Sequence, residues 1–336
     1  MSNILGKQFC VVSFGESHGP VIGVVIDGCP AGLKIDTDQI ANDLARRRPG
    51  QALTTPRNEP DNFEILSGLF NGHTTGAPIC FTIRNHDIDS SKYEDRRFTP
   101  RPGHADYTAF IKYGGFEDYR GGGRFSARVT AGLTIAGSLA KQLLEKIGAT
   151  VSAKILEIGG TDKNWDEKIA QAAELGDSVG GIIEGEALHL PVGLGEPLFD
   201  KLDSELAKIL FSLPAVKGVE FGSGFAAAKK LGSENNDPFE IQNGKIVTKT
   251  NHAGGILGGL SNGMPLIVRV AFKPIASIAK EQETIDLKTG RPAFLKTEGR
   301  FDPCPIPRAV PLVEAVMAIV LADFALRQRY LPRVLR

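Results

Sequence analysis

The sequence predicts an α+β protein made of antiparallel sheets and amphipathic helices. Its strand-like segments, such as VIGVVID (Val21–Asp27), alternate apolar and polar residues, which favours antiparallel sheets covered on one face. A faint repeat is the second observation: residues 23–33 and 181–194 each pair such a strand with a Pro-x-Gly-Leu corner, and an amphipathic helix follows each corner. We therefore expect residues 1–336 to form a single domain with two structurally related halves.

Composition and charge limit the class of protein. Apolar residues make up 42% of the 336-residue chain and charged residues 23%, which is typical of soluble proteins with a substantial core. The formal net charge is zero, so no global field attracts nucleic acid or an anionic membrane, and we expect neither partner. The most apolar stretch, residues 309–326, carries Glu314 and Asp323, which predicts a buried helix and not a membrane span.

The cysteines and glycines add two expectations. The four cysteines form no CxxC pair and have no metal-ligand spacing, and no signal peptide is evident. This pattern is typical of reduced thiols and predicts a cytoplasmic protein without a metal site. The 39 glycines gather in motifs and not in linkers, so no domain boundary is expected.

The first element along the chain is a turn, FGESHG at residues 14–19, between the strand-like segments QFCVVSF and VIGVVID. Glycines that flank polar residues mark a tight turn where the backbone can approach another group. A ligand can therefore reach His18 more easily here than inside a helix. For this motif alone, a surface turn with an incidental histidine is the alternative.

Two helices are expected on either side of a long polar stretch. Residues 36–48 begin with Asp36 or Thr37 as the N-cap and carry an apolar face. Residues 126–148 have the pattern of a second helix. Between them, residues 51–123 are dense in Pro, Gly, Asp, Arg and His, which predicts long ordered loops, and loops of that length are usually functional.

Arginine is concentrated in one zone of the chain. Eleven of the nineteen arginines lie between Arg46 and Arg128 with only two lysines, whereas residues 129–268 hold twelve lysines and no arginine. The forked guanidinium group suits carboxylates and phosphates, while lysine is the usual solvated surface cation. The zone therefore predicts a small ligand with several acidic groups. Structural ion pairs or a subunit interface are the alternative for some of these arginines.

Three further motifs carry candidate site residues. In residues 101–132, His104 lies in a Pro-Gly turn, and Arg124 and Ser126 lie where a triple-glycine loop meets a helix, an arrangement suited to an anion. The glycine-rich NHAGGILGGLSNGMP (residues 251–265) predicts either a surface for a flat ring or tight turns between strands. In GRFDPCPIPRAVP (residues 299–311), Asp302 could act in chemistry, cap the segment, or pair with Arg300.

Taken together and in this order, FGESHG, RRRPG, RPGHADYT, YRGGGR-x-SAR, AVKGVE, NHAGGILGG and R-x-DPC resemble the chorismate synthase family over nearly the whole chain. The resemblance implies a β-α-β sandwich of antiparallel sheets with helices between them, internally pseudo-duplicated and assembled as a homotetramer. It implies a lyase that converts 5-enolpyruvylshikimate 3-phosphate to chorismate and phosphate by anti-1,4 elimination, the last step of the shikimate pathway. The cofactor that it implies is reduced FMN.

The resemblance also implies roles for single residues. His18, exposed on its turn, would protonate the departing phosphate, and imidazole titrates at about pH 6.5, close to the operating pH. His104 would lie by the flavin and protonate it near N1. Asp302 would lie near the flavin N5, assisted by Ser17 and Ser126, where the C6 hydrogen of the substrate is removed.

The implied contacts fall on two sets of residues. The substrate-binding set is Arg47, Arg48 and Arg128, with Arg124 and Arg300 as further clamps. The FMN-binding set is Arg124, Phe125, Ser126, Pro214, Ala215, Gly258, Lys273, Pro274, Ile275, Ala276, Ser277 and Arg300.

The sequence departs from the family pattern in three places. RRRPGQALTTPR is one residue shorter than the pattern and lacks the arginine that the family uses to contact nicotinamide (NADP) or the substrate. Arg57 either takes over the role of that arginine or does not. FSARVT stands for SSARET, which puts Phe125 in place of a serine and Val129 in place of a glutamate. KPIAS stands for KPTSS. These departures bear on flavin affinity and on any flavin reductase activity, and not on the lyase reaction.

Two other functions compete with the lyase. A phosphatase could use the same turn and arginines, but it would need a nucleophile or a metal cluster, and the six histidines show no HxH or HExxH spacing. A non-catalytic flavin-binding or RNA-binding module would leave His18 and Asp302 without a task. Purification with FMN and a substrate analogue distinguishes the three.

Overall fold

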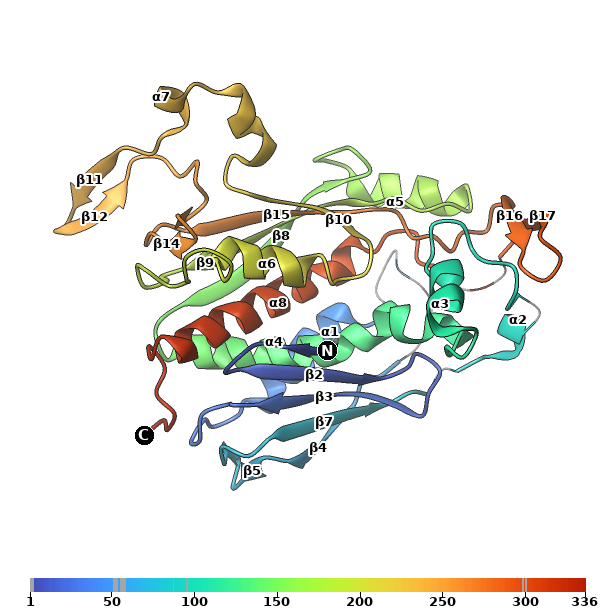
Figure 1. Cartoon of the computed structure of the whole chain (residues 1–336), viewed down its shortest axis with the longest axis horizontal. Coiled ribbons are helices and arrows are strands. Elements are labelled where there is room, and N and C mark those ends of the chain that lie inside the picture. Colours follow the sequence, from blue (N-terminus) through green and yellow to red (C-terminus); the bar gives the residue numbers. More distant parts are fainter. Residues whose placement is uncertain are drawn as a thin grey trace.

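Two antiparallel sheets enclose a layer of helices in the computed structural model (Figure 1). The structure describes residues 3–50, 54, 59–86, 88–94, 96–297, 299 and 301–336. The first sheet has the strand order β1-β2-β3-β7-β4 and the second β10-β15-β9-β8, and neighbouring strands are antiparallel in both. This confirms the predicted α+β sandwich, whereas the relation between its two halves stays a prediction.

The strands alternate between buried and partly exposed residues, as their sequences predict. In the first sheet they are β1 (Ile4–Leu5), β2 (Cys10–Gly15), β3 (Val21–Asp27), β4 (Phe63–Ser67) and β7 (Ile79–Arg84). In the second they are β8 (Thr150–Ile158), β9 (Gly181–Leu188), β10 (Val216–Phe221) and β15 (Leu266–Phe272). The short two-stranded ribbons pair β5 (Leu69–Phe70) with β6 (His73–Thr74), β11 (Phe239–Gln242) with β12 (Lys245–Thr248), β13 (Ile256–Leu257) with β14 (Leu260–Ser261), and β16 (Gln282–Asp286) with β17 (Arg291–Leu295).

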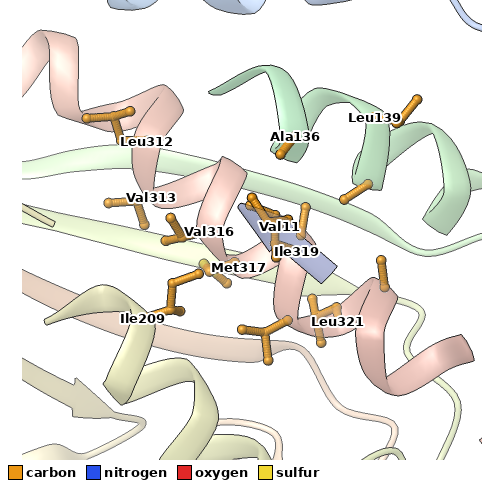
Figure 2. Packing of buried hydrophobic residues seen from close by; sticks show 14 of the residues in the cluster. Val11, Ala136, Leu139, Ile209, Leu312, Val313, Val316, Met317, Ile319 and Leu321 are labelled. Atoms are coloured by element: carbon orange, nitrogen blue, oxygen red, sulfur yellow. The ribbon is translucent and has the colours of Figure 1, made fainter. Parts of the chain in front are cut away.

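The helix layer is built on α4 (Thr130–Glu145) and α8 (Ile306–Arg327), which pack against each other. A Cβ atom at Gly137 would lie 2.2 Å from the Cβ of Ala315, so the two backbones approach closely because one residue is glycine. Helix α8 also packs against α6 (Leu202–Leu210), β8 and β9, and Figure 2 shows part of this buried cluster, with Val316 and Met317 on α8 and Ala136 and Leu139 on α4. The core therefore runs through both sheets and the helices between them.

Helix α8 is long and apolar enough to cross a membrane by length and composition alone. However, 89% of its most apolar window is buried inside the protein, where the helix separates the two sheets (Figure 1). This burial confirms the predicted buried helix. Glu314 on α8 is also buried and accepts two hydrogen bonds of 2.7 Å from Arg46, which ties α8 to α1 (Thr37–Arg47).

The remaining helices frame this layer. Helix α1 (Thr37–Arg47) begins at the predicted cap, because Asp36 accepts hydrogen bonds from the backbone of Asp38 and Gln39. Helix α4 begins four residues later than predicted, because a short 3-10 turn, η2 (Ala127–Val129), precedes it. The others are α2 (Ser91–Glu94), α3 (Asp106–Tyr113), η1 (Arg120–Phe125), α5 (Trp165–Glu174), α6 (Leu202–Leu210), η3 (Gly224–Lys229) and α7 (Gly232–Asn235).

The prediction of long loops across residues 51–123 is wrong for residues 63–84. This stretch forms β4 to β7, and β4 and β7 extend the first sheet beyond β3. The reason is the period-two pattern of FEILS and ICFTIR, in which Ile79, Phe81 and Ile83 are buried. The glycines between the two segments make turns between strands and do not make a loop.

Candidate active site

The triple-glycine loop contacts both candidate histidines. Gly121 and Gly122 have φ angles of 58° and 82°, in the left-handed region that favours glycine. A Cβ atom on Gly121 would lie 2.2 Å from Cδ2 of His18, and one on Gly122 would lie 3.3 Å from Nε2 of His104. The motifs FGESHG and RPGHADYT lie far apart in the sequence, but the loop brings their histidines against two adjacent glycines.

His18 is covered, and the expectation that it is exposed on its turn is wrong. The residue is only 5% exposed. Its Nδ1 lies 2.8 Å from the hydroxyl oxygen of Ser90, and its ring meets the ring of Tyr93 edge-on with the centroids 5.1 Å apart. The segment around α2 thus lies over the ring from one side, while Gly121 packs against it. Ser17, its neighbour in the turn, is 6% exposed.

His104 lies in the predicted turn and has charged neighbours. Its Nδ1 lies 2.6 Å from Oδ1 of Asp106 and 3.1 Å from a guanidinium nitrogen of Arg101. Arg101 also donates two hydrogen bonds of 2.8 Å to the same carboxylate. Burial by itself would raise the pKa of Asp106, but the hydrogen bonds from Arg101 and His104 outweigh it and hold that pKa well below its usual value.

Several predicted cofactor residues lie beside the His104 turn. Lys273 donates from its ammonium group to the carbonyl of Gly103 at 2.9 Å, and from its backbone to the carbonyl of Ala215 at 2.8 Å. Ser277 accepts a hydrogen bond of 2.9 Å from Arg101. Of the rest of the KPIAS segment, Ala276 lies next to Gly103, and Ile275 accepts a hydrogen bond from Ser178. Pro214 precedes Ala215 at the start of β10, and Pro274 follows Lys273.

Lys273 lies in a locally cationic environment. Burial lowers its pKa, and the charge of Lys217 lowers it further. The ammonium group of Lys273, together with the nearby Arg101, is suited to a bound phosphate, which would relieve the repulsion that Lys273 feels there. The chemistry of these donors therefore fits the phosphate-bearing end of a flavin nucleotide, although two hydroxyls of the family pattern are missing from KPIAS.

Residues 124–126 join the loop to the first sheet. Arg124 donates hydrogen bonds of 3.0 Å to the carbonyl of Gly15 and to the side chain of Asn3. Phe125 is 40% exposed, so its ring is accessible to a ligand. Ser126 caps η2 by accepting a hydrogen bond of 3.3 Å from the backbone of Arg128. Arg124 is therefore a support of the loop in this conformation, and the serine lies at the beginning of a helical turn, as predicted.

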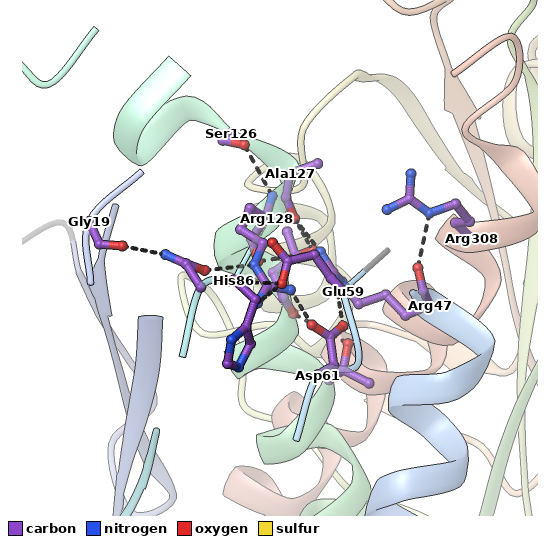
Figure 3. A network of polar contacts seen from close by, with 12 residues as sticks. Gly19, Arg47, Glu59, Asp61, His86, Ser126, Ala127, Arg128 and Arg308 are labelled. Atoms are coloured by element: carbon purple, nitrogen blue, oxygen red, sulfur yellow. Dashed lines mark hydrogen bonds and ion pairs between the residues drawn. The ribbon is translucent and has the colours of Figure 1, made fainter. Parts of the chain in front are cut away.

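Two of the predicted substrate arginines form a buried ion cluster (Figure 3). Arg47 lies 3.1 Å from Asp61 and also donates to the carbonyl of Ala127 at 2.8 Å. Arg128 pairs with the other oxygen of Asp61. Burial lowers the pKa of Arg47 to about 10 against the attraction of Asp61. These contacts are the ones expected if Arg47 and Arg128 form structural ion pairs, which was the alternative to ligand binding. Arg48, at the end of α1, is exposed.

Asp302 pairs with Arg308. The two side chains are 2.5 Å apart, and Asp302 also accepts a hydrogen bond of 3.4 Å from the backbone of Cys304, just before α8. Burial raises the pKa of Asp302, against the lowering effect of Arg308. Arg308 in turn donates to the carbonyl of Arg47 at 3.0 Å, so Asp302 is linked to the buried arginine cluster. The predicted partner Arg300 and the candidate replacement Arg57 lie outside the described residues.

Gly258 is separated from the other predicted cofactor residues. It forms the turn between β13 and β14, and its segment packs at the start of β15, where Gly255 lies against Pro265 and Leu266. Lys273 follows the other end of the same strand, beside the His104 turn. Within one chain, β14 and α3 accordingly lie at opposite ends of the molecule (Figure 1).

Sequence reasoning did not identify the partners of the two histidines. Asp106 had a signal, because an aspartate two residues after a histidine in a turn can reach the imidazole ring. Ser90 and Tyr93 had no such signal, because they lie more than seventy residues from His18 in the sequence. Asn85 was also missed, and it bonds to Glu16 and Gly19, the first and last residues of the tight turn within FGESHG.

Comparisons with known proteins agree with this fold, whose candidate site gathers the donors of an enzyme that binds small polyanions. The chorismate synthase family model matches residues 9–326. The chain is 53% identical to a chorismate synthase of Dehalococcoides mccartyi, with both chains fully covered, and 49% identical to one of Korarchaeum cryptofilum over 97% of this chain and 98% of the relative. A crystal structure of chorismate synthase matches with a TM-score of 0.76 at 28% identity, over 96% of this chain and 93% of that one.

The chain belongs to the chorismate synthase family. It is a lyase that converts 5-enolpyruvylshikimate 3-phosphate to chorismate at the final step of the shikimate pathway, towards the aromatic amino acids.

Proposed function

We propose that the chain carries out this elimination with reduced FMN bound beside the His104 turn and with His18 as the acid for the leaving phosphate. The single observation that carries the proposal is the contact of both histidines with adjacent glycines of one loop. Two imidazoles placed by the same loop can serve two ligands that lie against each other. Reduced FMN, when bound there, would supply reducing power that is recovered in each turnover, so the reaction would have no net redox change.

The residues of the chain divide the remaining tasks. We assign the phosphate-bearing end of the flavin to Lys273, Ser277 and Arg101, because these donors converge next to His104. Arg47, Arg48 and Arg128 are assigned to the carboxylates and phosphate of the substrate. For the buried pair this requires that substrate anions compete with Asp61 for the guanidinium groups.

We assign removal of the C6 hydrogen of the substrate to the surroundings of Asp302, with assistance from Ser17 and Ser126. The raised pKa of Asp302 is consistent with a group that can exchange a proton, because burial disfavours its charged form. Its pairing with Arg308 is equally consistent with a structural clasp at the start of α8. The assignment therefore depends on a measurement of turnover per folded molecule in Asp302→Asn.

We also propose a cytoplasmic homotetramer. One feature that supports oligomerisation is the β11–β12 hairpin, which projects from the body with Phe239, Ile241 and Ile246 at least 66% exposed (Figure 1). Two-stranded hairpins are marginally stable in water unless something covers an apolar face. Light scattering on the purified protein measures the number of subunits directly.

An anaerobic assay with chemically reduced FMN tests the cofactor. We expect chorismate, followed by its absorbance, to form only when reduced flavin is present. Oxidised FMN without a reductant serves as the control and should give no turnover, although it should still bind. Turnover at a comparable rate with oxidised FMN alone would show that the cofactor assignment is wrong.

A further inference from the structure

Asn85 joins the turn that carries His18 to the first sheet. The residue directly follows β7, and its side-chain amide nitrogen donates to the carbonyl of Glu16 at 3.1 Å and to that of Gly19 at 2.7 Å. Its backbone N–H donates to the carbonyl of Pro20 at 3.2 Å. The two side-chain bonds reach residues on either side of His18. The turn is therefore fixed at both ends by one amide group.

The other side of the same amide group faces the buried arginine cluster. The side-chain oxygen of Asn85 accepts a hydrogen bond of 2.9 Å from Nε of Arg128, and Arg128 pairs with the fully buried carboxylate of Asp61. A backbone carbonyl only accepts and a guanidinium only donates, so the orientation of the amide is determined by its partners. An amide is the group that satisfies both sides at once, because a carboxylate has no donor for the two carbonyls.

We propose that Asn85 is a positioning residue for His18, which it holds against Gly121 and Ser90 by bonding to both ends of the turn. The inference rests on the proposed role of His18 as the acid. Asn85 itself does not need to touch the substrate. It acts by fixing the location of the His18 imidazole. Because the same amide bonds to Arg128, it also links that location to the Arg128–Asp61 pair.

The test is a double-mutant cycle that combines Asn85→Asp with His18→Asn. Asn85→Asp keeps the shape of the side chain but places an acceptor opposite the carbonyls of Glu16 and Gly19. We expect the rate constant in an anaerobic single-turnover assay to fall about 10- to 100-fold in the otherwise unchanged protein. A catalytic group that is misplaced by about 1 Å can lower the rate about 10²-fold. In the His18→Asn background the same change should cost less than about twofold, because the group that it positions is gone.

Gln328→Glu is the matched control. Gln328, at the end of α8, donates to the carbonyls of Gly193 and Gly195 at 3.2 and 2.8 Å and accepts from the backbone of Gly195 at 3.2 Å. Its amide thus has the same pattern of two carbonyls and one donor, but it holds a loop that carries no site residue. We expect kcat to change less than about twofold, even if the melting temperature falls as in Asn85→Asp.

Each outcome decides the question. An equal loss of kcat from Asn85→Asp in both backgrounds, or no loss in folded protein, would overturn the proposal. If Asn85→Asp does not fold, Asn85→Ala takes its place in the cycle; because it also removes the acceptor of Arg128, the part of its cost that disappears in the His18→Asn background is the quantity that decides. If His18→Asn alone leaves turnover unchanged, the proposed role of His18 fails, and that result is distinct from equal losses in the two backgrounds.

Discussion

His18 and His104 contact adjacent glycines of one loop, yet their Nδ1 atoms have partners of different kinds. His18 lies 2.8 Å from the hydroxyl of Ser90, beside the ring of Tyr93. His104 lies 2.6 Å from the carboxylate of Asp106, which Arg101 also binds. One histidine is thus held by a neutral group that can rotate its proton, and the other by a charged group that can only accept one.

The difference indicates how each ring can handle a proton. A carboxylate can only accept a hydrogen bond, so the 2.6 Å contact with Asp106 favours the tautomer of His104 that carries its proton on Nδ1. A hydroxyl can donate to Nδ1 of His18 or accept from it, so His18 keeps its partner in every protonation state. That freedom suits a group that must give up a proton during turnover and later regain it.

The largest effect is expected from removing either ring. His18→Asn and His104→Asn should each lower turnover about 10²- to 10⁴-fold, the usual contribution of a positioned acid or base. Because His18 is only 5% exposed, we also expect a lower melting temperature for His18→Asn than for His104→Asn. An anaerobic single-turnover assay and thermal unfolding separate the two quantities. Normal turnover per folded molecule in both variants would contradict the catalytic assignments.

The second prediction compares the two glycines. An alanine at Gly121 or at Gly122 would have to adopt a left-handed backbone conformation, which costs about 1–2 kcal/mol. This part of the destabilisation is therefore the same for the two variants. The Cβ atoms meet different surroundings: 2.2 Å from the His18 ring for Gly121→Ala, but 3.3 Å from the His104 ring for Gly122→Ala. Gly121→Ala should therefore reduce turnover about tenfold more than Gly122→Ala, since small misplacements are costly. Equal losses would show that the loop does not position the two rings separately.

The sequence could predict the elements of this site better than their contacts. The strands on both sides of FGESHG, the cap at Asp36, the buried last helix and the turns around both histidines follow from local patterns, because period, caps and glycine placement act over a few residues. Strands β4 and β7 also had a local signal in FEILS and ICFTIR, but the glycines between them suggested loops.

The contacts that could not be predicted are those between distant segments. The burial of His18 depends on Ser90 and Tyr93, and the pairing of Arg47 with Arg128 through Asp61 depends on how α1, η2 and the chain before β4 meet. A count of arginines in a zone cannot distinguish a guanidinium that waits for a ligand from one that already has a carboxylate. Only the placement of Asp61 makes that distinction in the structure.

The third prediction concerns Asp106→Asn, which should lower turnover less than loss of the ring itself. The variant keeps the shape of the side chain but removes the charge that orients His104. Stability should also change with pH. The pKa of Asp106 is depressed in the folded protein, so its contribution is present above the unfolded value of about 3.9 and is lost as the pH falls below it. The melting temperatures of the parent and of Asp106→Asn should therefore converge on acidification, and a constant difference would contradict this account.

The smallest effect is expected from Ser90→Ala, which removes the neutral partner of His18 and leaves the ring itself in place. A hydrogen bond between neutral groups contributes about 0.5–1.5 kcal/mol, so turnover should fall about two- to tenfold. Ser91→Ala is the control, because the neighbouring hydroxyl bonds to Asp89 and not to His18. Ser90→Thr keeps the hydroxyl and should recover most of the activity. If Ser90→Ala lowers turnover as much as His18→Asn does, the hydroxyl takes part in the proton transfer and does more than hold the ring. The partners of His18 and His104 would then differ in function as well as in charge.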